Sequence, residues 1–371
     1  MKKVTVFFRS QPVLVISCAA ALITMFFIPP DMQYIGYCNF GVLAELFALM
    51  TAVAGLRGAG LFEKLTTALL KRAGTLRHLS QIFIFLCFFS SMLVTNDVAL
   101  ITFVPLTLMA FADIEDEKSR ILTVVLETVA ANLGSMMTPV GNPQNLFLFD
   151  KYEMSGMQFI QTMLPAGIAS LLCLILLSFL IPKAACPVKE HEKVNMSAAR
   201  TVVWALMFAV CVAAVFKLLP YWVCAAAAAS AALILDRGLL LKVDYCLLAT
   251  FVFFFVFVGN IARVDAVNAF FSDILKTNEV IVSALLSQVI SNVPASVMLS
   301  GFTQNGTALL LGVNLGGLGT PIASMASLIS LQFYRKAKDA KTGKYLAVFS
   351  AVNFGLLALL LVFCFCLDLI L

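Results

Sequence analysis

The feature that most constrains this chain is a series of apolar stretches long enough, or nearly long enough, to cross a lipid bilayer. Val13–Ile28, Phe159–Ile181, Thr201–Phe216 and Tyr345–Cys366 contain no charged side chain. A helix needs roughly 20 apolar residues to span the hydrocarbon core. Only 12% of all residues are charged, about half the share in soluble domains. The sequence therefore predicts an all-α, multi-pass membrane protein.

The distribution of lysine and arginine predicts how the chain is threaded. With the N-terminus in the cytoplasm, only Lys151, Lys217, Arg263 and Lys276 of the 25 basic residues fall outside, and the other 21 fall inside. Cytoplasmic loops carry an excess of basic residues. We therefore expect a cytoplasmic N-terminus, an external C-terminus and a place in the bacterial inner (plasma) membrane. These loops account for the net charge of +5, so we expect no nucleic-acid partner.

Two pairs of short apolar arms, each divided by a polar break, are predicted to form re-entrant helical hairpins. The first covers about 81–112 and breaks at Thr95-Asn96-Asp97, and the second covers about 280–302 and breaks at Ser291-Asn292. The arms of the first hairpin have roughly 15 residues, which is about 22 Å of helix and short for a full crossing. The threading depends on both hairpins, because an error of one crossing would spoil the segregation of basic residues.

Two further apolar segments, about 121–149 and about 307–333, are predicted to be discontinuous transmembrane helices. Asn132–Val140 and Asn314–Ile322 share Asn-Leu-Gly and Thr-Pro in the same register. An odd number of crossings separates them, which predicts two inverted repeats, 1–182 and 201–371, joined by a cytoplasmic linker at 183–200. Inverted repeats with discontinuous helices are typical of carriers that bind their substrate near the membrane midplane.

Polar residues at these breaks are the candidate binding groups. A helix that ends inside the membrane leaves carbonyl groups unpaired, and one that begins there leaves N–H groups unpaired. A hairpin tip therefore offers ligands for a cation and for an anion, and hydroxyl and amide side chains add more. The residues that we expect to contact the substrate are Thr95, Asn96, Asn142, Asn145, Ser291, Asn292 and Thr320.

Asp97 and Glu127 are the carboxylates placed deepest in the predicted membrane region, and an ionisable side chain there is a functional candidate. Asp97 either caps the second arm of its hairpin or binds a cation or proton. Glu127 is either a proton relay or a paired structural acid. We expect ion coupling to involve Asp97, Thr138, Gly141, Asn314 and Glu127, and we expect any Na⁺ site to lie near Asn96, Asp97 and Asn292.

Histidine and cysteine are poorly placed for catalysis. His78 and His191 are the only histidines, and both lie in polar connections. The ten cysteines lie mostly inside apolar runs and lack the spacing of metal ligands. We therefore expect neither an enzyme nor a cofactor other than H⁺ or Na⁺ as the coupling ion.

The break motifs resemble those of the ion transporter superfamily, which includes arsenite permeases, NhaD-type sodium/proton antiporters, and citrate and divalent-anion carriers. Thr95–Leu100, Thr138–Asn145 and Ser287–Pro294 carry the resemblance and look most like YbiR-type bacterial inner-membrane transporters. The resemblance implies a homodimer in which one part of each protomer carries both hairpins across the membrane as an elevator. Sodium-coupled anion symporters of the superfamily have Ser-Asn-Thr at both tips. This chain has Thr-Asn-Asp and Ser-Asn-Val, which leaves both proton and sodium coupling open.

The function expected from these features is secondary active transport of a small anion, either an organic carboxylate or an inorganic oxyanion such as arsenite. The alternative is a cation/proton antiporter. A channel is disfavoured because broken helices form binding sites rather than an open pore. The expected partners are membrane lipid, the anion and a second copy of the chain.

Overall fold

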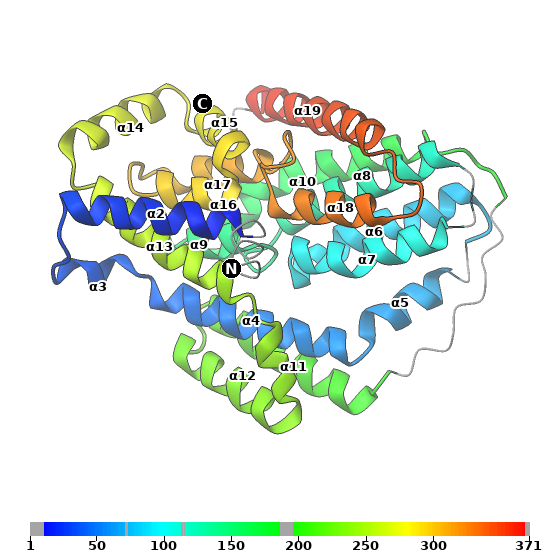
Figure 1. Cartoon of the computed structure of the whole chain (residues 1–371), viewed down its shortest axis with the longest axis horizontal. Helices are drawn as coiled ribbons and strands as arrows, with labels where there is room; N and C mark the ends of the chain where they lie inside the picture. Colours follow the sequence, from blue (N-terminus) through cyan, green and yellow to red (C-terminus); the bar gives the residue numbers. More distant parts are fainter. Residues whose placement is uncertain (1–10, 71–72, 113, 115, 186–195, 368–371) are drawn as a thin grey trace, which may run out of the picture.

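The structure is a computed structural model that describes residues 11–70, 73–112, 114, 116–185 and 196–367. Within these ranges the regular structure is helical, apart from an isolated bridge between Thr75 and Ala185. Part of the predicted linker, 186–195, lies outside the described residues, as do both ends of the chain. Figure 1 shows the arrangement of the helices.

In the part of the chain that the structure describes, nine helices, labelled α2 to α10, precede the linker. They are α2 (Pro12–Phe27), α3 (Gln33–Tyr37), α4 (Phe40–Gly58), α5 (Leu61–Leu70), α6 (Leu76–Val94), α7 (Asn96–Ala110), α8 (Glu117–Ser135), α9 (Pro143–Lys151) and α10 (Gly156–Ser178), with α11 (Ala198–Val215) following the linker. The pair α6–α7 is the first predicted hairpin, and α8–α9 is the first predicted discontinuous helix.

The second half repeats this order. Its elements after α11 are α12 (Tyr221–Leu235), the 3₁₀ helix η1 (Arg237–Lys242), α13 (Tyr245–Ile261), α14 (Asp265–Thr277), α15 (Glu279–Ile290), α16 (Asn292–Leu299), α17 (Gly306–Leu315), α18 (Met325–Lys336) and α19 (Thr342–Cys366). The pair α15–α16 is the second hairpin, and α17–α18 is the second discontinuous helix. The boundaries of the two repeats stay a prediction.

Among the described residues, five helices are long and apolar enough to cross a membrane, namely α4, α6, α10, α11 and α19. The chain bends by 102° between α13 and α14. If these two helices are treated as one bent span, they form a sixth. The first arm of hairpin 1 is longer than predicted, because α6 has 19 residues and begins at Leu76 rather than near 81. Thr75 caps this extra turn, since its hydroxyl accepts a hydrogen bond from the His78 N–H at 3.3 Å.

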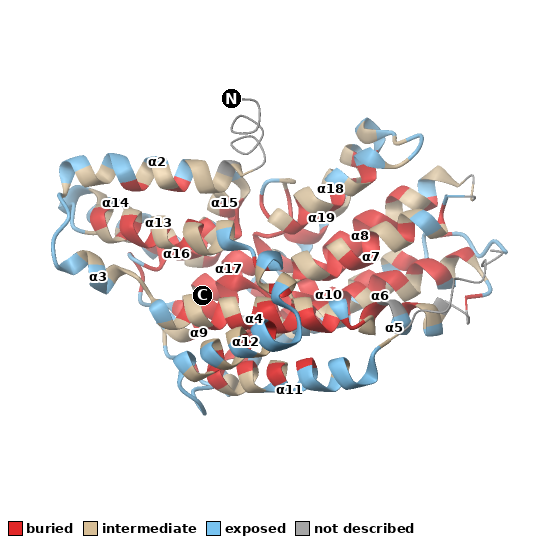
Figure 2. Cartoon of the chain, turned by 60° about the horizontal axis from the view of Figure 1, so that its bottom comes forward, coloured by how far each residue is buried: buried red, intermediate tan, exposed pale blue. Residues whose placement is uncertain are grey.

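The helices pack as two bundles. The scaffold bundle consists of α2, α4, α11, α12, η1 and α13, and the hairpin bundle consists of α6–α10 and α15–α19. In Figure 1, α11 and α12 lie along the lower edge beside α4, and α19 lies along the upper edge. The bundles meet where α4 packs on α9 and where α13 packs on α16. Figure 2 shows buried residues concentrated in the middle, where α8 and α17 are buried along most of their lengths.

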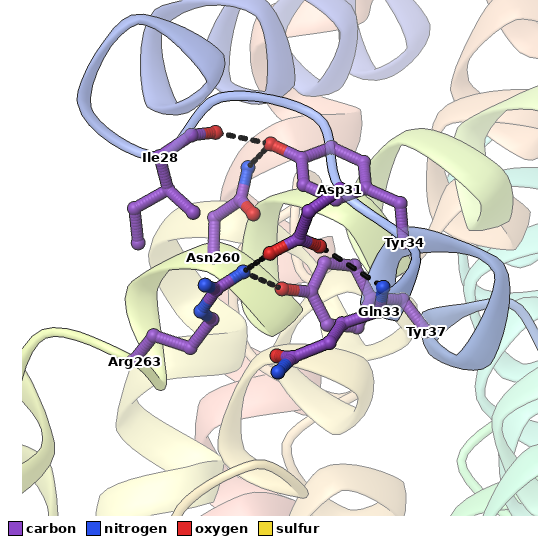
Figure 3. Close-up of polar contacts among 7 residues, drawn as sticks. All are labelled: Ile28, Asp31, Gln33, Tyr34, Tyr37, Asn260 and Arg263. Carbon is purple, nitrogen blue, oxygen red and sulfur yellow. Dashed lines mark hydrogen bonds and ion pairs between the residues drawn. The ribbon is translucent and has the colours of Figure 1, made fainter.

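A polar clasp holds α2, α3 and α13 together at one end of the scaffold bundle (Figure 3). Arg263 forms an ion pair with Asp31 at 2.8 Å and donates to the Tyr37 hydroxyl at 3.0 Å. Asn260 donates to the Tyr34 hydroxyl at 2.8 Å. These contacts attach the segment that joins α2 to α4, which contains α3, to the C-terminal end of α13.

Polar contacts at the two ends of the molecule join segments that the predicted threading places on the same side. Asp150 accepts a hydrogen bond from Asn39 at 2.7 Å and pairs with Lys217 at 3.5 Å, all in predicted external connections. Glu117 pairs with Lys341 in predicted cytoplasmic connections. The pairing of segments agrees with the threading, whereas the side that faces the cytoplasm stays a prediction.

Candidate functional site

The two hairpin tips have the same backbone geometry. Thr95, between α6 and α7, has φ 71° and ψ 149°, and Ser291, between α15 and α16, has φ 75° and ψ 154°. Residues other than glycine rarely adopt this backbone conformation. It costs of order 1–3 kcal/mol and is found only where the surrounding structure enforces it. The side chains of Asn96 and Asn292 then accept the next backbone N–H at 2.9 Å. Both predicted breaks are therefore tight turns, each closed by a bond from an asparagine side chain to the next backbone N–H.

Each tip is bonded through its backbone to the break of the discontinuous helix in the same half. The Asn96 N–H donates to the Gly141 carbonyl at 3.3 Å, and the Asn292 N–H donates to the Ala323 carbonyl at 2.9 Å. The N–H groups that begin α7 and α16 are thus partly satisfied by carbonyls freed at the breaks. This pairing makes irregular backbone tolerable inside a membrane.

The threonines of the two Thr-Pro motifs also bond to the hairpins in the same way. The Thr138 hydroxyl donates to the Met92 carbonyl, and the Thr320 hydroxyl donates to the Gln288 carbonyl at 3.0 Å. Met92 and Gln288 each lie three residues before their tip. Both threonines therefore hold the tip of a hairpin against a helix break in this conformation.

Asn132, at the end of α8, connects the two halves. Its side-chain oxygen accepts from Asn96 at 3.1 Å and from the Ser324 hydroxyl at 3.0 Å. Its amide nitrogen donates to the Gly317 carbonyl at 3.4 Å. Asn132 thus joins the tip of hairpin 1 to the break between α17 and α18.

Asn314 occupies the matching position at the end of α17 and makes the reciprocal connection. Its side-chain oxygen accepts from Asn142 at 3.0 Å, and its amide donates to the Asn145 side chain at 2.6 Å. The Asn145 amide in turn donates to the Thr138 carbonyl at 3.0 Å. Each half therefore places one asparagine in the helix break of the other half.

A cavity of about 680 Å³ lies beside the tip of hairpin 1, between the two bundles. This volume is in the range of small-molecule sites. The N-termini of α7 and α9 both reach it, through Thr95, Asp97 and Asn142. Its opposite wall belongs to the scaffold bundle. The charged residues that line this cavity are Arg57, Asp97, Lys242 and Asp244.

The tip of hairpin 2 has much less free space. The cavity lined by Ser291, Val293 and Pro294 measures only about 10 Å³. Asn292 is buried, and its side-chain oxygen accepts a hydrogen bond from the Val293 N–H. The two tips therefore share a backbone design but differ in access in this conformation.

Asp97 is the titratable residue that hairpin 1 brings to the cavity. Its Oδ1 atom is buried and has no hydrogen-bond partner among the described residues. Asp244 lines the same cavity, and the described residues place no ion pair on either side chain. A carboxylate in this setting is suited to bind a proton or a cation.

Glu127 lies apart from the cavity, inside the hairpin bundle. It is fully buried, and its Oε1 atom accepts from the Thr107 hydroxyl at 2.6 Å and from the Cys87 thiol at 3.9 Å. Its Oε2 atom has no partner in the described part of the chain. The structure therefore separates the two acids that the sequence grouped together as coupling residues.

The predicted site residues fall into three groups. Thr95, Asp97 and Asn142 line the large cavity, and Ser291 lines the small one. Bonds between tips and helix breaks engage Asn96, Thr138, Gly141, Asn145, Asn292, Asn314 and Thr320. Glu127 alone lies elsewhere. Their roles in transport stay predictions.

Sequence reasoning missed several residues that build the site. Asn132 and Gln288 stand inside the quoted motifs, but pattern alone did not show that they bridge elements. Arg57 and Lys242 were counted only as cytoplasmic charges, although both face the cavity. Their position at the ends of helices, next to apolar segments, was the sequence feature that could have identified these two residues as cavity residues.

Two hairpin tips, two discontinuous helices and a cavity between two bundles define a membrane transporter of the carrier type. The sequence profile described as citrate transporter matches residues 4–305. The chain belongs to this family, whose members are transporters rather than enzymes.

Relatives along nearly the full length support this assignment. An uncharacterized transporter of Methanocaldococcus jannaschii is 34% identical over 343 residues, covering 90% of this chain and 91% of the relative. The inner membrane protein YbiR of Escherichia coli is 30% identical over 324 residues, covering 85% of each. The silicon efflux transporter LSI3 of rice is 30% identical over 153 residues, which is 41% of this chain and 31% of that protein. The resemblance to YbiR-type transporters is thereby confirmed.

The fold is shared by a solved transporter structure. The YdaH transporter of Alcanivorax borkumensis superposes with a TM-score of 0.53 at 16% identity, covering 88% of this chain and 85% of that one. The predicted class, an all-helical ion-transporter fold, is confirmed.

Proposed function

We propose that this transporter is a secondary active carrier of a small anion, either an organic carboxylate or an inorganic oxyanion such as arsenite. The observation that supports this most directly is that two helix N-termini, those of α7 and α9, meet at one cavity. Helix N-termini attract anions because unpaired N–H groups and the helix dipole both favour negative charge. The citrate transporter family supports the same class of substrate.

Asp97 is the proposed coupling residue. Its charge lies at the N-terminus of α7 and opposes an incoming anion until a proton or Na⁺ neutralises it. Binding of the ion therefore favours binding of the anion, which is the linkage that a symporter needs. If Na⁺ is the ion, the proposed site is near Asn96, Asp97 and Asn292, with Thr138, Gly141 and Asn314 holding its surroundings. Glu127 is proposed as a second proton site.

Transport is proposed to follow an elevator mechanism. The cavity lies between the bundles, with the hairpin tip on one wall and α4 and η1 on the other. Movement of the hairpin bundle along the scaffold bundle would carry a bound anion from one side to the other. We propose a homodimer in the bacterial inner membrane with its N-terminus in the cytoplasm and its C-terminus outside.

The alternative function is cation/proton antiport. Two carboxylates on one cavity, Asp97 and Asp244, favour it, because they suit a cation as well as a proton. Proteoliposomes that contain a pH-sensitive dye separate the two functions. An antiporter moves protons when a Na⁺ gradient is applied without any anion, whereas the proposed symporter moves them only when its anion is present.

The test of the proposed function is uptake of labelled citrate, succinate and arsenite into proteoliposomes. We expect saturable uptake of at least one of these anions, driven by a gradient of H⁺ or Na⁺. Asp97→Asn removes the titratable group at nearly constant shape, so uptake should lose its dependence on pH and Na⁺. Asp273→Asn, at an exposed position on α14, is the control. Unchanged pH and Na⁺ dependence in Asp97→Asn would rule out this role.

A further inference from the structure

We propose that Arg57 and Lys242 bind the anionic groups of the substrate and select anions that carry at least two negative charges. The inference rests on the proposed function, since it specifies which anions the cavity accepts. It concerns the wall that faces the hairpin rather than the hairpin tip itself. Both residues line the 680 Å³ cavity with Thr95, Asp97 and Asn142.

Arg57 lies in the last turn of α4, half-buried at the cavity. Its Nη2 atom donates to the Ile101 carbonyl of α7 at 3.4 Å. A guanidinium has five N–H donors, so this bond positions the group and leaves donors for a ligand. No carboxylate in the described part of the chain pairs with it. A partly buried cation without a counter-ion is costly near a membrane, which favours a site completed by an anion.

Lys242 ends η1, two residues before Asp244 caps α13. It is exposed, lines the same cavity and likewise has no ion pair among the described residues. Because η1 packs against α4, Lys242 and Arg57 both belong to the scaffold bundle. The scaffold wall therefore presents two cations to one cavity.

The two walls differ in what they contribute to an anion. The hairpin wall supplies helix N-termini and the Asp97 carboxylate, which has to be neutralised. The scaffold wall supplies two permanent positive charges and one carboxylate, Asp244, which accepts a hydrogen bond from the Leu247 N–H as the cap of α13. An anion with two or more carboxylates engages Arg57 and Lys242 at once, and Arg57 suits a carboxylate because its planar donors match the two oxygens. A monocarboxylate satisfies one of them, and a neutral solute gains nothing from either.

The test measures binding by the purified full-length protein in lipid nanodiscs. The probes are citrate, which has three carboxylates, acetate, which has one, and neutral boric acid. The wild type should bind citrate much more tightly than acetate. Arg57→Gln should raise the Kd for citrate by about tenfold, the scale of a charge-assisted hydrogen bond. Lys242→Gln should raise it by roughly threefold, because solvent weakens charges at an exposed rim.

Two variants control for folding and for general electrostatics. Arg237→Gln removes a positive charge from an exposed position of η1 that does not line the cavity, and the Kd should not change. Arg57→Lys keeps the charge but loses the planar donor set, so its Kd should lie between those of the wild type and Arg57→Gln. If Arg57→Gln does not fold, Lys242→Gln and Arg57→Lys decide the question.

The outcomes separate this inference from the proposed function. If the wild type binds citrate and both Arg57→Gln and Lys242→Gln stay within twofold of its Kd, the inference is overturned while anion transport stands. Equal affinity for acetate and citrate overturns the selection for multiple charges. If the wild type takes up no anion in proteoliposomes, the proposed function fails and the inference fails with it.

Discussion

At the residue scale, asparagines at the helix breaks connect parts of the molecule that are far apart in sequence. Asn132 bonds to the tip of hairpin 1 and to the break between α17 and α18, and Asn314 bonds to the break between α8 and α9. Both side chains are almost fully buried. An amide suits this position because it donates and accepts at once, so a single side chain satisfies backbone and side-chain groups from two helices.

We predict that Asn132→Ala destabilises the protein by about 1–2 kcal/mol, because it leaves buried polar groups of both halves without a partner. Thermal unfolding in detergent, followed by tryptophan fluorescence, measures the effect. Asn268→Ala, which removes an exposed amide from α14, should leave the transition unchanged. An Asn132→Ala variant as stable as the wild type would show that the connection contributes little to stability.

At the element scale, close packing of a hairpin arm on a discontinuous helix recurs in both halves. A Cβ atom on Gly134 of α8 would lie 2.0 Å from the Phe88 carbonyl oxygen of α6. A Cβ atom on Gly316, which caps α17, would lie 2.8 Å from the Cα atom of Ala284 on α15. Glycine is therefore required where the backbones of arm and helix approach each other.

Gly134→Ala should separate α6 from α8 and cost about 1–3 kcal/mol, the usual range for overpacking a core. Gly316→Ala should cost less, because its contacts are longer. The matched control is Gly355→Ala in α19, where nothing lies within 4 Å and alanine should add roughly 0.5–1 kcal/mol of helix stability. Midpoints of thermal unfolding for the three variants test this order, and a neutral Gly134→Ala would contradict it.

An ion-pair cluster ties the start of α8 to the start of α19. Glu117, ahead of the apolar part of α8, pairs with Lys341 and, at 3.6 Å, with Lys344. Its hydrogen bond with Lys341 holds the pKa of Glu117 below its ordinary value of 4.5. A carboxyl with a lowered folded-state pKa stabilises the protein above its unfolded pKa and loses that contribution as pH falls through the folded pKa.

We therefore expect the wild type to lose this contribution below about pH 4.5, and Glu117→Gln to lack it at every pH. The difference in melting temperature between the two proteins should be small at pH 7, because Lys341 and Lys344 are exposed to solvent, and should shrink as the pH falls towards 3. Melting curves between pH 3 and pH 7 check this. A difference that stays constant over this range would argue against the ion pairs as its cause.

At the scale of the whole molecule, the two hairpin tips differ in access. Thr95 lines a cavity of about 680 Å³, whereas Ser291 lines one of about 10 Å³. The other residues around the large cavity include Arg57 and Lys242, which the predicted threading places on the cytoplasmic side. In this conformation the free space therefore lies at the tip of hairpin 1, with almost none at the tip of hairpin 2.

Thiol labelling in inside-out vesicles checks this difference. In a background without the native cysteines, Thr95→Cys should react with a membrane-impermeant maleimide, and Ser291→Cys should react much more slowly. Citrate that occupies the cavity should slow labelling at Thr95→Cys. Equal labelling of both variants would contradict the asymmetry, and labelling of Thr95→Cys only in right-side-out vesicles would reverse the predicted orientation.

The sequence by itself determined the class of fold and the position of both hairpin tips. Apolar length requires membrane helices, and Asn-Leu-Gly and Thr-Pro in one register marked the helix breaks. These features are local, since a polar break or a Thr-Pro pair within an apolar run favours the end of a helix wherever the chain packs. The structure then placed the breaks at Thr95 and Ser291 within the predicted motifs.

Only the tertiary structure decided which polar residues face free space. The side chains of Asn145 and Thr320 form hydrogen bonds between elements. Arg57 and Lys242, which the sequence places among the loop charges, line the cavity with Asp97. It also separated Glu127 from Asp97, because α8 carries Glu127 into the hairpin bundle. The position of α4 and η1 across the cavity from hairpin 1 sets these relations. No local sequence pattern shows them, because they depend on which helices become neighbours.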